Sequence, residues 1–215
     1  MRTLPLKIDL HVHTCYSGDT ATTLEEVVTY AKGRGLDGIA ITDHGTVAGA
    51  LELLKNTDLL VIPGIEVETL CGHILGLNVT QPIPQGLSAS ETVERIHGSG
   101  GITIIAHPFA AFKSRWKLRV LSSLKVDAIE VKNSSNFPFL LTTYLNERLA
   151  GRLNLPQTAG SDAHIPQAIG TAYTLIEADS ELEEIVQAIK RGAVTPCGGA
   201  LSWALRFKNL FRKKR

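Results

Sequence analysis

Two histidines near the start of the chain, His11 and His13, have the type and spacing of metal ligands. The surrounding run, residues 8–13, is typical of a buried β-strand, in which residues two apart point to the same face. Both imidazoles therefore aim at one place, while Leu10 and Val12 face the other way into apolar packing. An ordinary pair of strand histidines would show the same pattern, so the positions of the other histidines decide between the two interpretations.

Further imidazoles and carboxylates stand at or just after the ends of other short apolar runs, and His73 opens one. Six of the seven histidines belong to this set. Its members are His11, His13, Asp19, Asp43, His44, Glu66, His73, His107, Asp162 and His164. Histidines scattered over a surface would not sort in this way, so the pattern predicts that these side chains meet at one site.

The types of side chain in this set indicate the kind of site. Imidazole and carboxylate together suit Zn, Mn or Fe, whereas a site for Mg or Ca is mostly oxygen. The set exceeds what one metal can use, so we expect two or three divalent metal ions with a carboxylate bridging two of them. Metals about 4 Å apart activate a water and stabilise both oxygens of an in-line phosphoryl displacement.

The elements that position these residues alternate along the chain. Strand-like runs occupy residues 8–13, 38–42, 59–65, 73–77, 102–106, 127–131 and 156–159, with an eighth extended segment at 172–176. Helical patterns occupy residues 22–34, 51–54, 88–97, 109–124, 139–152 and 180–191, and three of them begin with capping boxes at Thr22, Ser88 and Ser180. This alternation predicts a parallel β/α architecture, either a closed barrel of seven or eight units or an open doubly wound sheet. In a barrel, the carboxyl ends of the strands form one mouth, where active sites lie.

Composition sets the class of protein. The chain has 215 residues, 44% hydrophobic and 20% charged, which fits one globular domain. We expect a cytoplasmic protein, because the three cysteines are far apart and form no disulfide framework, and because no signal-peptide pattern or membrane-spanning apolar run is present. The net charge of +1 gives no argument for a nucleic-acid-binding body.

The last residues differ from the rest. The predicted domain covers residues 1–200, and residues 201–215 form a basic amphipathic tail. Apolar residues at Trp203, Phe207, Leu210 and Phe211 predict one face of a helix, surrounded by cations. Two interpretations stay open: a terminal helix packed on the domain, or a weak contact with an anionic surface, either membrane or nucleic acid.

Six short motifs, taken in order, resemble the PHP (polymerase and histidinol phosphatase) family of metal-dependent phosphoesterases. They cover roughly residues 6–176 and are Asp9-Leu-His-Val-His-Thr14, Ile41-Thr-Asp-His-Gly45, Gly64-Ile-Glu66, Gly72-His73, Ala106-His-Pro108 and Gly160-Ser-Asp-Ala-His164. The resemblance implies a distorted (β/α)7 TIM-like barrel with up to three metals.

The resemblance also implies a distribution of ligands. One metal takes His11, His13, Glu66 and Asp162, and Glu66 bridges to a second metal completed by His73 and His107. A third takes Asp19, His44 and His164. The family often has an Asp or His close after the His-x-His pair, and here the acid, Asp19, comes later in the sequence. If Asp19 does not reach the site, we expect two metals instead of three.

The predicted activity is hydrolysis of a phosphomonoester or of a nucleotide or oligonucleotide phosphate. A metal-bridging hydroxide attacks phosphorus, with Glu66 and Asp43 as the catalytic carboxylates and Asp43 acting either as an orienting group or as a proton carrier. Lys113 and Arg115, shortly after His107, are candidates to hold the substrate phosphate. The alternative in which Glu130 points into the mouth is the less favoured one.

Two alternatives to this function remain. One is a C–N hydrolase of the amidohydrolase type; such enzymes often use a lysine-derived bridge, and the lysines here do not close the candidate strands. The other is a non-catalytic barrel that binds metal or a partner. The complete ligand set counts against it.

Overall fold

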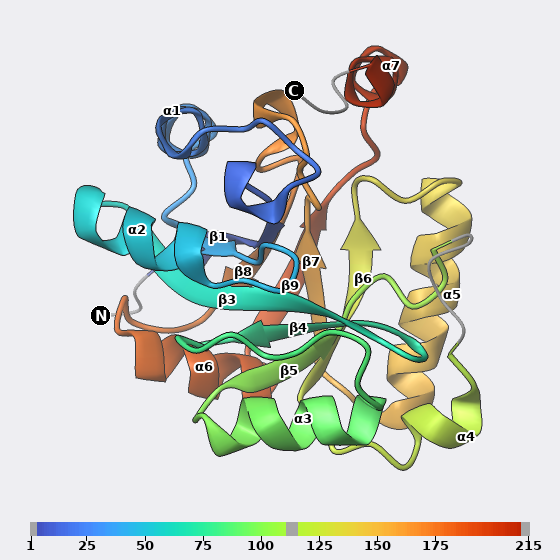
Figure 1. Cartoon of the computed structure of the whole chain (residues 1–215). Helices are drawn as coiled ribbons and strands as arrows, with labels where there is room; N and C mark the ends of the chain where they lie inside the picture. The colour runs from blue at the N-terminus through green and yellow to red at the C-terminus, as the bar shows by residue number, and fades with distance from the viewer. Residues whose placement is uncertain (1–3, 111–115, 212–215) are drawn as a thin grey trace.

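The sheet is built around the strand that carries the His-x-His pair. The computed structural model describes residues 4–110 and 116–211, with side chains up to Asn209 (Figure 1). Nine strands are present in the described residues: β1 (Leu6–Val12), β2 (Gly38–Ile41), β3 (Leu60–Thr69), β4 (Gly72–Leu77), β5 (Ile102–Ile105), β6 (Ala128–Asn133), β7 (Gln157–Gly160), β8 (Ala172–Ile176) and β9 (Val194–Gly198). Their order in the sheet is β7-β6-β5-β4-β3-β2-β1-β8-β9.

The end of β7 closes the sheet back onto β1. The backbone N–H of Asp162 donates to the carbonyl of His11 at 2.8 Å, and that of His13 donates to the carbonyl of Ala163 at 3.1 Å. A bridge between Val12 and Ala163 completes the contact. Strands β1 to β7 thus form a nearly closed, seven-stranded barrel, and β8 and β9 extend the sheet beside β1. The prediction of a distorted (β/α)7 barrel is confirmed, and the open doubly wound sheet is not the fold.

The prediction of a parallel sheet throughout was wrong. Strands β3 and β4 pair antiparallel, as do β4 with β5, β1 with β8, and β8 with β9. Only Leu70 and Cys71 separate β3 from β4, and so short a connection makes a hairpin, because a parallel crossover needs a dozen or more residues. The hairpin matters for the site because Glu66 lies on β3 and His73 on β4.

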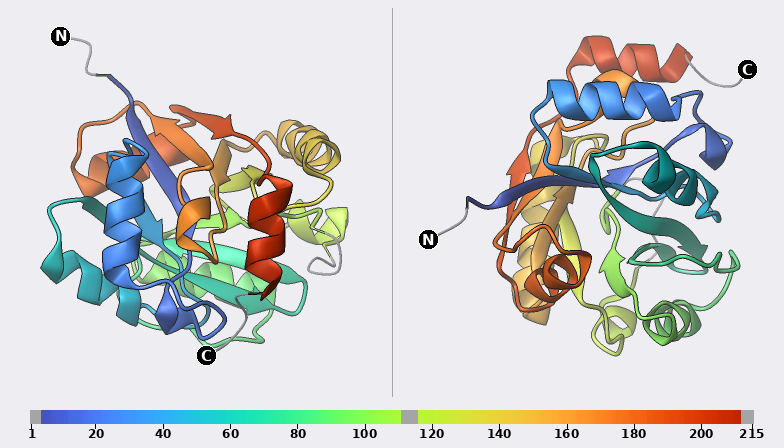
Figure 2. Two further views of the ribbon diagram at one scale, coloured as in Figure 1. Left: turned by 90° about the horizontal axis from the view of Figure 1, so that it is seen from above. Right: turned by 90° about the vertical axis from the view of Figure 1, so that its left-hand side faces the viewer.

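Seven α-helices are present in the described residues, with α1 and α7 at the upper end in Figure 1 and α3 and α6 at the opposite end (Figures 1 and 2). They are α1 (Leu24–Gly33), α2 (Ala48–Asn56), α3 (Ala89–Gly98), α4 (Leu118–Leu121), α5 (Phe139–Leu153), α6 (Leu182–Lys190) and α7 (Trp203–Phe211). Short 3-10 turns, η1 (Cys15–Ser17) and η2 (Pro166–Ala168), follow β1 and β7.

Several predicted helix starts need correction. The capping box of α1 is formed by Thr23 and Glu26, one residue later than predicted, whereas Ser88 caps α3 as predicted. Glu181, not Ser180, precedes α6, and it makes no side-chain cap. Of the helix predicted at residues 109–124, only the single turn of α4 forms in the described part, and residues 111–115 lie outside it.

A β-bulge in β1 separates the apolar side chains of the opening strand. The register with β2 shifts between Asp9 and Val12. Leu10 packs with the strand residues that α6 covers, whereas Val12 packs with α1 and α2. Both residues lie in apolar packing as predicted, but in two different clusters, because a bulge adds one residue to the strand and redirects its side chains.

Helix α7 packs on the barrel, but not through the face predicted from its sequence. Leu205 packs against the cluster of α1 and α2, and Arg206 donates to backbone carbonyls after β6. Trp203 and Phe207, which were expected to face inward, are 64% and 56% exposed. Residues 203–211 therefore form a terminal helix packed on the domain, as one of the two interpretations expected. The side chains that face the barrel are not the predicted ones.

A search of the described residues finds no helix with the length and apolar character needed to cross a membrane.

Candidate metal centre

The structure brings all nine predicted ligands to the mouth of the barrel. Their ligand atoms fall into four overlapping groups, and within each group the atoms lie within 4.8 Å of one another. The groups are His13, Asp19, His44 and His164; His11, His107 and Asp162; His11, His13 and Glu66; and His44, Glu66 and His73. These residues come from β1, β3, β4 and the segments that follow β1, β2, β5 and β7.

Glu66 lies at the centre, with its two oxygens facing different histidines. Its Oε2 is 3.4, 3.2 and 3.3 Å from nitrogens of His11, His13 and His44. Its Oε1 is 2.7 Å from Nδ1 of His73 and 3.1 Å from Nε2 of His107. A carboxylate that divides its oxygens in this way has the arrangement of a bridge between two metal ions.

The donor set on the β1 side fits a cation. Glu130 accepts from Nδ1 of His11 at 2.8 Å, so the other nitrogen, Nε2, presents a lone pair when the ring is neutral. That Nε2 lies 3.1 Å from Nε2 of His13 and 3.5 Å from Oδ1 of Asp162. Lone pairs and carboxylate oxygens converge here in a fully buried space, an arrangement stable only with a positive charge between them.

The acid after the His-x-His pair reaches the site. Gly18 adopts a left-handed conformation (φ 78°) at the end of η1 and so turns Asp19 toward His164 and His44. Oδ2 of Asp19 lies 2.9 Å from Nε2 of His164 and 3.4 Å from Nε2 of His44. The other oxygen, Oδ1, is buried without a hydrogen-bond partner, which leaves it available to a metal ion.

Glu130 is the residue that the sequence analysis undervalued. It is 1% exposed and points into the mouth, where it bonds His11 and also accepts from the backbone N–H of His107 and from Nδ2 of Asn133, both at 2.9 Å. The same amide group of Asn133 lies 3.3 Å from Oδ2 of Asp162. Glu130 therefore orients two candidate ligands at once, as a carboxylate behind a metal-binding histidine does. The signal in the sequence was a lone acid inside an apolar strand, since a charge there needs partners.

Glu130 gives a test of this supporting role. The substitution Glu130→Gln would replace one carboxylate oxygen with an N–H donor, so the contacts of that oxygen, either with His11 or with His107 and Asn133, would be lost. We expect Glu130→Gln to weaken metal binding by about 10–100-fold, the usual effect of removing such a partner. Titration of metal-free protein with Mn²⁺ measures the change, and Glu94→Gln, an exposed acid on α3, is the control. Equal affinities for the two variants would contradict the role.

The side chain of Asp43 supports the turn after β1, whereas its backbone carbonyl accepts from the backbone N–H of Glu66 at 3.1 Å. Its carboxylate oxygens accept from the backbone N–H of Thr14 at 2.6 Å and from the Thr14 hydroxyl at 2.8 Å. Burial raises the pKa of Asp43. Of the two predicted roles, these contacts favour the orienting group over the proton carrier. The other predicted polar residues, Lys113 and Arg115, lie outside the described residues.

Carboxylates set the charge of the imidazoles. Burial opposes a proton on His11, but the charges of Glu130, Asp162 and Glu66 outweigh it and raise the pKa of His11 well above its ordinary value. Burial likewise opposes the charged forms of His44 and His164, and hydrogen bonds with Asp19 outweigh it, so both pKa values are raised. These three rings thus hold a proton more strongly than an ordinary imidazole does.

This competition predicts how metal binding depends on pH. A metal ion binds neutral imidazole, so it must displace the protons whose pKa values are raised. We expect Mn²⁺ binding at about pH 7 to release protons, and the affinity to increase as the pH rises from about 6 to 8. Isothermal titration calorimetry in buffers of different ionisation enthalpy counts the protons. Binding heats that do not depend on the buffer would refute the expected competition.

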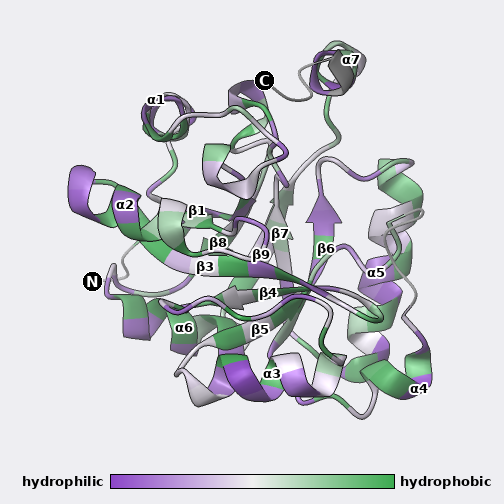
Figure 3. Cartoon of the chain, viewed as in Figure 1, coloured by the Kyte–Doolittle hydropathy of each residue, from purple (hydrophilic) through white to green (hydrophobic). Residues whose placement is uncertain are grey.

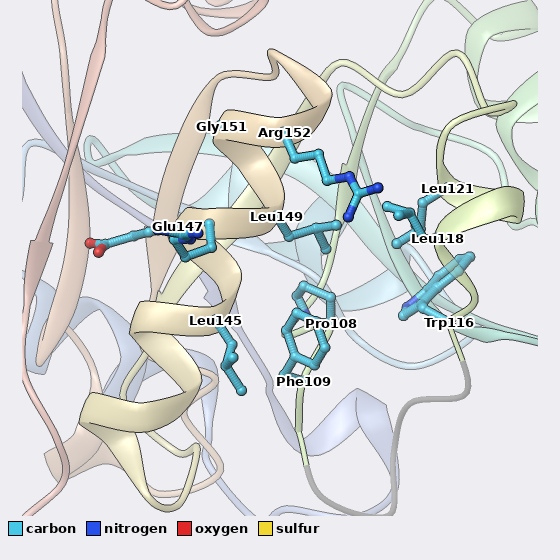
Figure 4. A pocket seen from close by; sticks show the side chains of 11 residues that line it. Pro108, Phe109, Trp116, Leu118, Leu121, Leu145, Glu147, Leu149, Gly151 and Arg152 are labelled. Carbon is cyan, nitrogen blue, oxygen red and sulfur yellow. The ribbon is translucent and has the colours of Figure 1, made fainter.

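A separate hollow lies beside the centre, between α4 and α5 (Figure 4). It has a volume of about 760 Å³ and is lined mainly by apolar side chains, among them Pro108, Trp116 and Leu149. None of the nine candidate ligands lines it, so the polar mouth and this apolar hollow are distinct features.

The fold and the site together define a metal-dependent phosphoric ester hydrolase. A family model described as PHP-associated matches residues 145–194. The uncharacterized protein MJ1587 of Methanocaldococcus jannaschii is 36% identical over 142 residues, which cover 60% of this chain and 82% of that protein. The chain belongs to the PHP family of metal-dependent phosphoesterases.

One further relative is similar in sequence, and one solved structure is similar in fold. A phosphoribosyl 1,2-cyclic phosphate 1,2-diphosphodiesterase of Eggerthella lenta is 39% identical over 102 residues, 42% of this chain and 38% of that protein. A two-domain protein of Bacteroides vulgatus, containing a predicted PHP-like metal-dependent phosphoesterase, has the same fold. Its TM-score is 0.76 at 17% identity, and the match covers 97% of this chain and 69% of that one.

Proposed function

We propose that the chain hydrolyses a phosphomonoester or a nucleotide or oligonucleotide phosphate at a centre of three divalent metals. The observation that carries the proposal is the division of the Glu66 oxygens between two sets of histidines. The nine ligands and the orphaned oxygen of Asp19 support the third metal. Zn, Mn and Fe all suit a donor set of imidazole and carboxylate.

Each group of residues has a distinct task. His11, His13 and Asp162 would hold one metal, His73 and His107 a second, and Glu66 would bridge them. When bound, the metals lower the pKa of water and stabilise negative charge on phosphoryl oxygens. Glu130 keeps the proton of His11 on Nδ1, away from the ligand nitrogen, because it accepts a hydrogen bond there. Asp43 fixes Thr14 and with it the turn that presents Asp19.

The decisive experiment measures hydrolysis of an aryl phosphate and a panel of nucleotides. Metal-free protein is reconstituted with Mn²⁺, Zn²⁺ or Fe²⁺ and compared with chelated protein. Turnover that depends on metal supports the proposal. Bound metal without turnover on any phosphate ester would favour the C–N hydrolase, and absence of both would favour a non-catalytic barrel.

The number of metals has its own test. We expect Asp19→Asn to lower the metal content by one ion per chain, because it weakens only the group with His44 and His164. Elemental analysis of the purified proteins measures this content. Asp58→Asn, at an exposed acid, is the control. Identical metal contents for Asp19→Asn and the control would argue for a two-metal centre.

The state of the cysteines bears on the compartment. Cys15, Cys71 and Cys197 are all free thiols. We propose a cytoplasmic location, because a reducing compartment keeps separated thiols in this state.

A further inference from the structure

Three aromatic rings form an exposed cluster where α7 meets the segment after β6. Phe137, Trp203 and Phe207 are 55%, 64% and 56% exposed. The ring centroids of Phe137 and Trp203 lie 5.5 Å apart, and those of Trp203 and Phe207 lie 6.4 Å apart. We call these three side chains the aromatic platform. Single exposed apolar residues are ordinary, but a contiguous group marks a surface that binds something.

The platform is held in place from below. The guanidinium group of Arg206 donates to the carbonyls of Ser134, Ser135 and Asn136 at 3.1, 3.0 and 2.7 Å. The same group lies 5.4 Å from the ring centroid of Phe137. These contacts fix α7 to the segment after β6, so the rings are organised before any partner arrives.

This segment also touches the metal centre. The Ser135 hydroxyl donates to the carbonyl of Asp162 at 2.9 Å, and Asn133 bonds both Glu130 and the Asp162 carboxylate. Strand β6 ends here in hydrophilic residues, at the same end of the molecule as α7 (Figures 1 and 3). The platform and the candidate ligand Asp162 thus share one short support.

We propose that the substrate is a single-stranded oligonucleotide whose bases stack on the aromatic platform while its phosphate lies at the metal centre; this rests on the proposed function. Exposed rings accept the faces of any base, and such stacking is available only to bases that are not already stacked in a duplex. Residues 199–211 contain Arg206 and Lys208 and no acid, which suits a polyanion.

The position of the platform favours an oligonucleotide over other occupants. A bilayer or a second copy of the chain seated on these rings would use the platform alone. An oligonucleotide would use the platform and the metals together.

The test compares substrates of different length in the metal-loaded protein. For wild-type protein we expect a single-stranded decanucleotide to have a lower KM than a mononucleotide. Trp203→Ala and Phe207→Ala, made separately, should each weaken binding of a labelled phosphorothioate decanucleotide by about tenfold, which is the usual effect of removing one stacked ring. Fluorescence anisotropy measures this binding. Hydrolysis of an aryl phosphate should be unchanged. Trp203→Phe should restore most of the binding, and Leu54→Ala, at an exposed leucine on α2, is the control.

The outcomes separate this inference from the proposed function. If the protein hydrolyses an aryl phosphate, and wild-type, Trp203→Ala and Leu54→Ala proteins bind the decanucleotide equally well, the role of the platform is refuted. The proposed phosphoesterase activity would still be supported. Ring-dependent binding without hydrolysis of any phosphate ester would support the platform and refute the proposed function. A further contrary result is a Trp203→Ala protein that binds the decanucleotide as wild type does but loses binding to phosphatidylserine vesicles, or loses a dimer seen by sedimentation. Either loss would assign the rings to another occupant and overturn the inference.

Discussion

Glu66→Gln is expected to reduce metal-dependent hydrolysis on the order of 10³-fold, since a lost bridge removes several kcal/mol of charge stabilisation. The substitution keeps the size of the side chain but removes its charge. Burial alone would raise the pKa of Glu66, yet the charge of His11 and hydrogen bonds from His107, His11 and His13 lower it well below its ordinary value. The native residue is therefore anionic throughout the working range of pH.

Strand β3 supplies a matched control for this substitution. Glu68 lies two residues farther along the strand, and it is exposed. Glu68→Gln removes the same charge from the same strand. Among the described residues, Glu68 is the strand partner of His73, but no hydrogen bond or ion pair joins its side chain to a candidate ligand, so turnover should stay near the wild-type value. Steady-state rates on an aryl phosphate at saturating Mn²⁺ measure both variants. Similar activity in the two variants would show that Glu66 does not bridge metals.

Removal of metal is expected to lower the thermal midpoint of unfolding by about 8–16 °C. A ligand present at 1,000 times its dissociation constant stabilises the native state by about 4 kcal/mol, and each kcal/mol corresponds to roughly 2–4 °C in a chain of this size. Differential scanning calorimetry of metal-loaded and chelated protein measures the difference. The bound ions act by occupying the buried set of carboxylates and imidazoles at the mouth of the barrel.

The size of this effect should depend on pH. In chelated protein, His11, His44 and His164 have pKa values raised above the ordinary value of 6.5. Groups of this kind stabilise the folded state below their unfolded pKa, and the stabilisation disappears as pH rises through the folded pKa. Chelated protein should therefore lose stability from about pH 6.5 upward, and the gap to metal-loaded protein should widen. A gap that narrows with rising pH would contradict the proton–metal exchange.

The gathering of the candidate ligands was predictable because both their type and their position carried information. His11 and His13 share a strand, and His107 and Asp162 each follow an apolar run, so a barrel must bring them to one mouth. The alternation of strands and helices left a barrel of seven or eight units and an open sheet both possible, and the seven-stranded barrel was predicted from the family resemblance. The positions of the histidines depend on periodicity, which a single sequence displays.

The direction of the strands and the orientation of some side chains were harder to predict from the sequence. Nothing in the periodicity of residues 72–77 distinguishes an antiparallel from a parallel strand. The available signal was the short connection, which spans residues 66–72 between the predicted strands and only Leu70 and Cys71 in the structure. Glu130 sits between Ile129 and Val131, and in a strand buried on both faces the alternation does not say which way it points. Helix α7 misled for another reason: Arg206 found carbonyl partners and turned the aromatic residues outward.

The contact between β7 and β1 sets the order of events during synthesis. The backbone of His11 emerges from the ribosome early, but it is paired with Ser161 and Asp162, and the Ser161 hydroxyl contact spans 150 positions. Contacts between such distant parts of a chain form late, because the intervening loop must close first. The His-x-His pair therefore lacks the Asp162 carboxylate until most of the barrel has been translated. The complete set of candidate ligands is thus assembled only after residue 164 has been made.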